Sequence, residues 1–233
     1  MKATKLFGWI FALGCIFSVN SHAQTLPFAG TIQYRISYSS DIIPSEQLAQ
    51  SPQVASLRIN ATKAIFSMGE EKTLADAETK TVYSLINLSQ LGLGKYRIES
   101  TEADLNDAMP QDLTLEATGN TKEIFGYKAQ EMQCQTKLQG ATVEMKIWCV
   151  ADFCDPFLIH ASQAGVPGLE GRFPLEYTIA TPDISMTFSV HKLSPEEVNP
   201  KYFNIPASYK SSTKEKMAAD IQEVMQAMQG MGM

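Results

Sequence analysis

The chain has 233 residues, with 19 basic and 25 acidic side chains and a formal net charge of −6. This acidic balance argues against nucleic acid and anionic membrane surfaces as partners. The length suits one domain, or one domain with a tail, and is sufficient for a hydrophobic core.

The first 23 residues have the pattern of a cleavable signal peptide. Two lysines precede a nearly continuous apolar run over residues 6–19, and small side chains precede the expected cleavage after Ala23. The run is shorter than the roughly 20 apolar residues of a membrane span. A lipid anchor at Cys15 is the alternative, because residues 12–15 loosely resemble a lipobox. We therefore expect an exported protein, periplasmic or associated with the outer membrane, without a transmembrane span.

Alternation of apolar and polar residues predicts strands along most of the remaining chain. The first covers residues 31–38, where Ile32 and Tyr34 alternate with polar side chains. Residues 44–49 are expected to form a turn or a short helix. Further strands are predicted around residues 57–59, 65–66, 81–85, 96–98 and 113–117, and later at 173–179 and 184–190.

The clearest hairpin surrounds the dipeptide at residues 139–140. A two-residue Gln-Gly turn there places Cys134 opposite Met145, and Met132 opposite Ile147. Because side chains alternate between faces with period two, these four side chains share one face, which we expect to be the core.

The C-terminal segment is predicted to form a helix. Ser212 and Glu215 have the spacing of a capping box, and Gly230 is expected to end the helix. Apolar residues recur at helical spacing at Met217, Ile221, Val224, Met225 and Met228.

Closely spaced strands without long intervening helices predict antiparallel hairpins rather than βαβ units. The expected fold is mainly β, a curved antiparallel sheet or open half-barrel with a C-terminal amphipathic helix that covers it. The expected organisation is a signal peptide over 1–23, a single β-rich domain over 24–210, and a Met-rich helix and tail over 211–233.

Several short motifs together resemble the GLPGLI family of exported bacterial proteins of unknown function. Residues 121–128 read TKEIFGYK, residues 165–170 read GVPGLE, and Ile147-Trp148 matches a strand-ending aromatic. The segments 30–34 and 203–209 resemble the edges of such domains. The chain departs from the family at Val166, Glu170 and Ala129, so the family's cysteine pattern is not carried over. The resemblance, over residues 28–210, implies a divergent relative and, by fold analogy, a sheet similar to that of LolA-like lipoprotein carriers.

Three cysteines follow the signal peptide, at Cys134, Cys149 and Cys154. A local Cys149–Cys154 disulfide is the preferred pairing in an exported protein, with a free pair or a metal site with His160 as alternatives. Cys134 is expected to be a buried apolar side chain. A Cys134–Cys149 bond is disfavoured, because the hairpin register separates the two by roughly 13 Å along the strand.

Other candidate sites have ordinary structural explanations. His191 is expected to face solvent, and the acidic pairs at 70–71 and 196–197 are expected to be solvated. The Gly-Val-Pro-Gly element at 165–168 suits a tight turn. The tail methionines, which include Met231 and Met233, suit copper(I) chemically, but helix packing or a partner contact is favoured. The sequence contains no nucleophile elbow, phosphate loop or HExxH motif.

The leading hypothesis is a non-catalytic envelope protein that binds a hydrophobic ligand or an envelope partner on a concave sheet face. It needs no cofactor, and its expected partners are a lipid or an envelope protein. The alternative is a structural or interaction protein with a filled core and no ligand. A hydrolase or a copper-binding protein is a third reading. The ligand-binding residues are not identified from the sequence.

Overall fold

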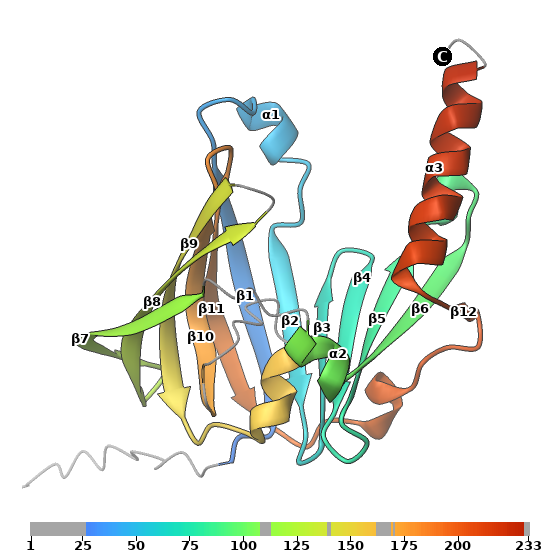
Figure 1. Ribbon diagram of the computed structural model, residues 1–233. Coiled ribbons are helices and arrows are strands. Elements are labelled where there is room, and N and C mark those ends of the chain that lie inside the picture. The colour runs from blue at the N-terminus through green and yellow to red at the C-terminus, as the bar shows by residue number, and fades with distance from the viewer. Residues whose placement is uncertain (1–26, 108–112, 139–140, 162–168, 170, 231–233) are drawn as a thin grey trace, which may run out of the picture.

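The computed structural model describes residues 27–107, 113–138, 141–161, 169 and 171–230 (Figure 1). The predicted signal peptide, with Cys15, lies outside the described residues. So do the tight turn at 165–168, the turn at 139–140, and both methionines after residue 230.

Twelve strands of the described residues form one sheet, in the order β12-β6-β5-β4-β3-β2-β1-β11-β10-β9-β8-β7. The first six are β1 (Gly30–Ser39), β2 (Val54–Ile59), β3 (Lys63–Met68), β4 (Glu71–Asp76), β5 (Thr81–Asn87) and β6 (Lys95–Thr101). The others are β7 (Thr114–Ile124), β8 (Tyr127–Leu138), β9 (Ala141–Ala151), β10 (Arg172–Ala180), β11 (Ser185–Pro195) and β12 (Tyr209–Ser212).

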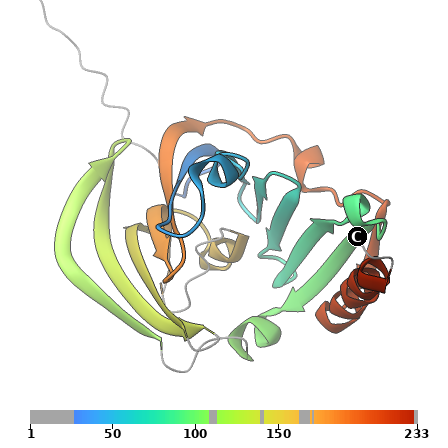
Figure 2. The same ribbon diagram turned by 90° about the horizontal axis from the view of Figure 1, so that it is seen from above.

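The sheet is curved and open, as the sequence predicted. All neighbouring strands are antiparallel except β12, which pairs with β6 in parallel. The strands β7 and β12 are its two edges. Seen from above, the sheet bends around an interior, and helix α2 (Glu102–Asp107) lies at the open side of the curve (Figure 2).

Two hairpins illustrate how short connections go with regular strand pairing. In the β8–β9 hairpin, Cys134 pairs with Met145 and Met132 pairs with Ile147, which confirms the predicted register. At the β7–β8 turn, Phe125 and Gly126 both have positive φ, at 49° and 83°. Two successive positive φ values define a type I′ turn, which matches the right-handed twist of the paired strands.

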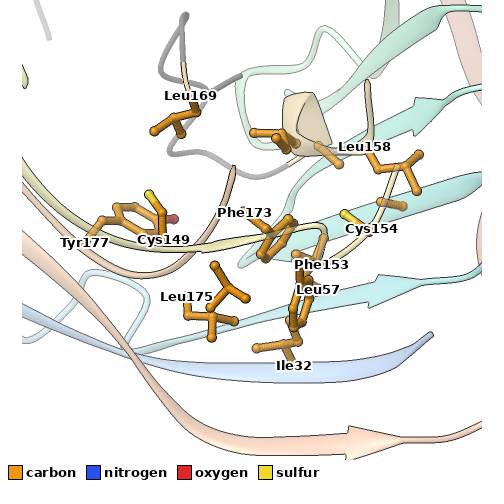
Figure 3. Packing of buried hydrophobic residues seen from close by; sticks show 14 of the residues in the cluster. Ile32, Leu57, Cys149, Phe153, Cys154, Leu158, Leu169, Phe173, Leu175 and Tyr177 are labelled. Atoms are coloured by element: carbon orange, nitrogen blue, oxygen red, sulfur yellow. The ribbon is translucent and has the colours of Figure 1, made fainter. Parts of the chain in front are cut away.

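The concave side of the sheet holds a continuous hydrophobic core. Ile32, Tyr34 and Ile36 of β1 point into it and are at most 1% exposed, as their alternation predicted. The 3₁₀ helix η2 (Pro156–Ala161) packs on β3, β4 and β10 within the curve. Figure 3 shows Phe153 and Phe173 within this core, and their rings stack with centroids 4.7 Å apart.

A smaller apolar cluster covers the other face of β3 and β4. Ile65 and Leu74 point away from the main core and pack with Val198 and Phe203. Phe203 belongs to η3 (Pro200–Phe203), so the chain after β11 returns across the outer face of the sheet. Strands β3 and β4 are therefore buried on both faces.

The C-terminal helix α3 (Lys214–Gly230) forms as predicted, but its cap and position differ from the prediction. Thr213 is the cap, because its hydroxyl accepts a hydrogen bond from the Lys216 amide at 3.2 Å. Ser212 instead ends β12. The helix lies beside β6, where the Tyr96 hydroxyl donates to Asp220 at 2.9 Å (Figure 1). The concave face is covered by η2 and not by α3.

The remaining elements are short. Helix α1 (Ser45–Leu48) confirms the helical turn predicted after Pro44, and η1 (Ser89–Leu91) precedes β6. Strand β4 was not predicted, because Glu71 and Lys72 begin it with exposed charges. Strand β12 was also missed, and the predicted domain boundary at residue 210 falls inside it.

Candidate functional site

An apolar row crosses six consecutive strands of the sheet, from β7 to β1. Each member is the cross-strand partner of the next, so all six share one face of the sheet. The members, in order, are Leu115, Cys134, Met145, Ile179, Met186 and Tyr38. We call this set the rim row.

A second row lies next to the rim row on the same face, two residues away from it on each of five strands. Its members are Met132, Ile147, Tyr177, Phe188 and Ile36, and none is more than 4% exposed. By contrast, every rim-row side chain except Cys134 is only half-buried. The apolar interior therefore has a packed floor and a rim that solvent reaches.

The floor is built on aromatic packing. The Tyr177 and Phe188 rings stack with centroids 4.5 Å apart, and Tyr34 meets both rings edge-on at 6.3 and 6.5 Å. Such offset and edge-on pairs add to the stabilisation from area burial. Phe66 joins the cluster from β3, 6.4 Å from Phe188. The floor is thus a rigid surface shared by strands distant in sequence.

One polar atom on the floor has no partner among the described residues. The Tyr177 hydroxyl is buried without a hydrogen bond, and its side chain is 1% exposed. Burial raises the pKa of Tyr177 well above its ordinary value. The phenol is therefore neutral and able both to donate and to accept. The nearby Tyr34 hydroxyl, in contrast, donates to the Pro174 carbonyl at 3.4 Å.

Replacing Tyr177 by phenylalanine tests whether this hydroxyl is unpaired in the ligand-free protein. An unsatisfied buried donor costs about 1–3 kcal/mol, so Tyr177→Phe is expected to raise the free energy of unfolding or leave it unchanged. Tyr34→Phe is the matched control and is expected to lower it by about 1 kcal/mol, because it removes a bond. Urea unfolding measures both. Equal destabilisation by the two variants would contradict the assignment.

The concave face beside β3, β4 and β10 is filled by η2. Phe157, Leu158 and Ile159 are buried there, with exposed fractions of at most 6%. Asp155 organises the start of η2, since its carboxylate accepts a hydrogen bond from the Phe157 amide at 2.9 Å. The half-buried rim row lies outside this filled part of the interior.

The structure contains Cys134, Cys149 and Cys154 as free, buried thiols. Cys134 lies on the core face, as predicted, and pairs with Met145 rather than with Cys149. Burial raises the pKa of both Cys149 and Cys154 to about 12, so both thiols are protonated at neutral pH. The expected Cys149–Cys154 disulfide is not present in this structure, and it stays a prediction.

The other predicted candidates do not converge on one site. His160 packs against Phe157 in η2, and burial lowers its pKa. His191 is exposed on the opposite side of the strand from the rim row, as predicted. No group of three or more His, Cys, Asp or Glu residues within the described part of the chain could hold a metal ion. Met217 is half-buried and Met225 is 55% exposed.

The rim row could not be recognised as a site from the sequence alone. Its signal existed in the alternation of each strand, where Met145, Ile179 and Met186 fall on the apolar side. Pairing of β7 with β8 and of β1 with β11 joins these patterns into one row. The β1–β11 pair connects residues about 150 positions apart, so neither a turn nor a loop length predicts it.

No family model matches the chain, and no curated protein matches it in sequence. Its fold is similar to a solved structure of PNGF-II in space group C2, with a TM-score of 0.52 and 13% identity over 84% of this chain and 33% of that one. PNGF-II in space group P21 gives a TM-score of 0.49 and 12% identity over 84% and 34%. LprF from Mycobacterium bovis gives 0.28 and 9% over 72% and 89%.

The chain spans about a third of the length of the PNGF-II chains that it matches. Within the described residues, no helix is long and apolar enough to cross a membrane. At 13% identity, the similarity shows that this chain shares its fold with a part of PNGF-II.

Proposed function

We propose that this protein is a non-catalytic envelope protein that binds a hydrophobic ligand along the rim row. The observation that carries the proposal is the continuous apolar row across six strands, with five of its six side chains half-buried. Half-buried apolar side chains next to a packed core gain free energy when a ligand removes their remaining surface from water. A half-buried apolar row beside a packed floor is suited to that purpose.

The composition of the row suits a flexible apolar ligand. Met145 and Met186 are unbranched and polarisable, so they adapt to ligands of different shape. Strands in a sheet lie about 4.8 Å apart, so six strands present an apolar path of about 24 Å. A long hydrocarbon with few polar groups meets these requirements.

Export and family membership are parts of the same proposal. The support for export is the signal-like segment before Ala23, and the proposed compartment is the periplasm or the outer membrane. The support for a relationship to the GLPGLI family is the set of motifs at residues 121–128 and 165–170. A Cys149–Cys154 disulfide is compatible with that compartment. The absence of recognisable catalytic motifs from the sequence supports a binding role over an enzymatic one.

Polar substitution in the rim row is expected to weaken ligand binding. Met145→Gln and Met186→Gln keep the side-chain length but remove apolar contact, so each is expected to raise Kd about fivefold and the double variant at least tenfold. Met225→Gln on the exposed face of α3 is the matched control and is expected to leave Kd unchanged. Titration with a fluorescent fatty acid measures Kd, and circular dichroism verifies folding.

Native mass spectrometry tests the proposal independently. A co-purifying lipid that is lost from the Met145→Gln/Met186→Gln double variant supports it. A clean ligand-free mass in several gentle preparations, together with no uptake of the fluorescent fatty acid, contradicts it.

A structural or interaction protein with a filled core is the second candidate. The observation that favours it is η2, whose buried Phe157 and Leu158 already occupy the concave face beside β3, β4 and β10. That reading predicts no ligand uptake under any condition.

A further inference from the structure

A polar cleft lies on the outer face of the sheet, where β11, β1, β2 and β3 are neighbours. Its volume is about 360 Å³, and its lining includes Val54 and the polar side chains of Gln33, Ser56, Ser67 and His191. Among the described residues, none that lines the cleft is acidic. An amide, two hydroxyls and an imidazole can both donate and accept hydrogen bonds, so the cleft suits a ligand rich in hydroxyl groups.

The cleft follows a row of cross-strand partners. Four residues, one from each strand, pair in succession and so share this face: Lys192, Gln33, Ser56 and Ser67. Lys192 is exposed and the other three are half-buried. Strands lie about 4.8 Å apart, so the row is about 14 Å long. Every member of the row reaches the surface, and a ligand can therefore contact all of it.

A β-bulge adds a second side chain at one end of this row. In the β1–β11 pair, Tyr34 is opposite Val190 and Gln33 is opposite Lys192, so His191 has no partner of its own. In a regular strand, His191 and Lys192 would face opposite sides of the sheet. The bulge instead sets two residues of β11 against Gln33, and His191 lines the cleft. Bulges of this kind re-aim side chains and are frequent beside functional sites.

Two cations stand beside the cleft without a partner. Arg35 lies two residues after Gln33 on the same face of β1 and pairs with Val54. Both Arg35 and Lys192 are exposed. Neither forms an ion pair or a side-chain hydrogen bond within the described part of the chain. This face therefore presents unpaired positive charge in a chain of net charge −6.

The acidic side chains near this face are bound elsewhere. Glu176 shares the row of Arg35 two strands away, and Lys122 holds it at 2.6 Å. Glu70 lies in the turn at the β3 side of the cleft and accepts a hydrogen bond from Asn87 at 2.7 Å. Neither carboxylate forms an ion pair with the two cations, so their charge is available to an external anion.

We propose that this outer cleft binds an acidic oligosaccharide, with sugar hydroxyls on Gln33, Ser56 and Ser67 and sugar carboxylates on Arg35 and Lys192. The site is on the opposite face of the sheet from the rim row, so it is independent of the hydrophobic site. Arg35 is the principal charge contact, because a guanidinium presents paired donors to a carboxylate.

The shape and lining of the cleft agree with this ligand class. Its volume is in the range of small-ligand sites and accommodates a short segment of sugar. Val54 is 62% exposed and offers an apolar contact to the C–H surface of a ring. No Phe, Tyr or Trp of the described residues lines the cleft, which disfavours nucleic acid, since its bases bind by stacking on such side chains.

The test uses short probes that separate charge from hydroxyl groups. Tetragalacturonate and tetramannuronate are acidic sugars, the methyl ester of tetragalacturonate is neutral, and tetraglutamate is acidic without sugar hydroxyls. Each is titrated by calorimetry into the full chain and its variants. Arg35→Gln is expected to weaken an acidic sugar about tenfold and Lys192→Gln about threefold, without effect on the ester. Ser56→Ala/Ser67→Ala is expected to weaken acid and ester alike.

Lys137→Gln is the matched control, because Lys137 is an exposed cation on β8, four strands from β1. It should change none of the affinities, and circular dichroism verifies the fold of each variant. Tight binding of an acidic sugar that falls to the level of the ester in Arg35→Gln supports the inference. Failure of both acidic sugars to bind overturns it, as does equal binding of acid and ester.

Two further results also overturn the inference. Binding of tetraglutamate as tight as that of the sugars would identify an acidic peptide as the ligand. Equal losses in Lys137→Gln and Arg35→Gln would show that binding follows the net charge rather than this cleft. Arg35→Gln should leave the affinity for the fluorescent fatty acid unchanged, so this inference and the rim-row proposal succeed or fail separately.

Discussion

Replacing Phe188 by alanine is expected to lower the free energy of unfolding by about 3–5 kcal/mol. Phe188 is 0% exposed, stacks on Tyr177 and meets the Tyr34 and Phe66 rings within 6.5 Å. The truncation loses the burial of a large side chain and leaves a cavity that rigid aromatic neighbours on three other strands cannot close. Urea unfolding followed by tryptophan fluorescence measures the loss.

Phe125→Ala is the matched control for Phe188→Ala. Phe125 lies in the β7–β8 turn and is 44% exposed at a positive φ of 49°. Alanine has the same backbone cost there as phenylalanine, so the change is expected to be below about 1 kcal/mol. If Phe188→Ala does not fold, Phe188→Leu is expected to retain the fold with a loss of about 1–2 kcal/mol. Similar effects at positions 188 and 125 would contradict the aromatic floor.

Replacing Glu131 by glutamine is expected to lower the free energy of unfolding by about 2 kcal/mol near neutral pH. Glu131 is 5% exposed, and its carboxylate contacts Lys146 at 2.6 Å and accepts hydrogen bonds from Thr118 and Asn120 at 2.7 Å each. These side chains reach it because strand β7 has a bulge between Ala117 and Thr121. Glutamine keeps the shape of the side chain but removes the charge that strengthens all three contacts.

The effect of Glu131→Gln is expected to depend on pH in a defined direction. The hydrogen bond from Lys146 and those from Thr118 and Asn120 lower the pKa of Glu131 from 4.5 to about 2. Because the folded-state pKa lies below the unfolded-state value, the stabilisation is complete above about 4.5 and is lost as the pH falls through about 2. The difference between the wild type and Glu131→Gln should therefore shrink as the pH is lowered across that range.

Glu116→Gln is the control for this titration, because Glu116 is an exposed carboxylate on the edge strand β7. It should change stability by less than about 0.5 kcal/mol. Urea unfolding of the three proteins near neutral pH and at about pH 3 provides the comparison. A constant difference between the wild type and Glu131→Gln across the two conditions would show that the carboxylate is not stabilised in the folded state.

Glu131 lies on a different face of the sheet from the rim-row residues of the fatty-acid prediction. Phe188 and the rim row face the interior, whereas Glu131 and Lys146 lie on the other face of the β8–β9 hairpin. Effects on fatty-acid binding from Glu131→Gln are therefore expected only through loss of folding. This separation makes Glu131→Gln a further check on the binding measurements.

The sequence by itself determined the features that depend on near neighbours. Period-two alternation placed Ile32, Tyr34 and Ile36 inside the sheet, and a two-residue turn fixed the register of Cys134 against Met145. Such patterns are local, because a strand has to alternate and a short turn allows few registers. The mainly β, curved and open architecture followed from them.

Only the tertiary structure decided which strands become neighbours across long separations and which segment fills the concave face. The pairing of β1 with β11, interrupted by a bulge at Gln33/Tyr34, joins Tyr38 to Met186 and completes the rim row. The segment that fills the curve is η2 and not the C-terminal helix, because its buried side chains fit against β3, β4 and β10. These outcomes depend on the fit between distant surfaces, and no local pattern of residues records that fit.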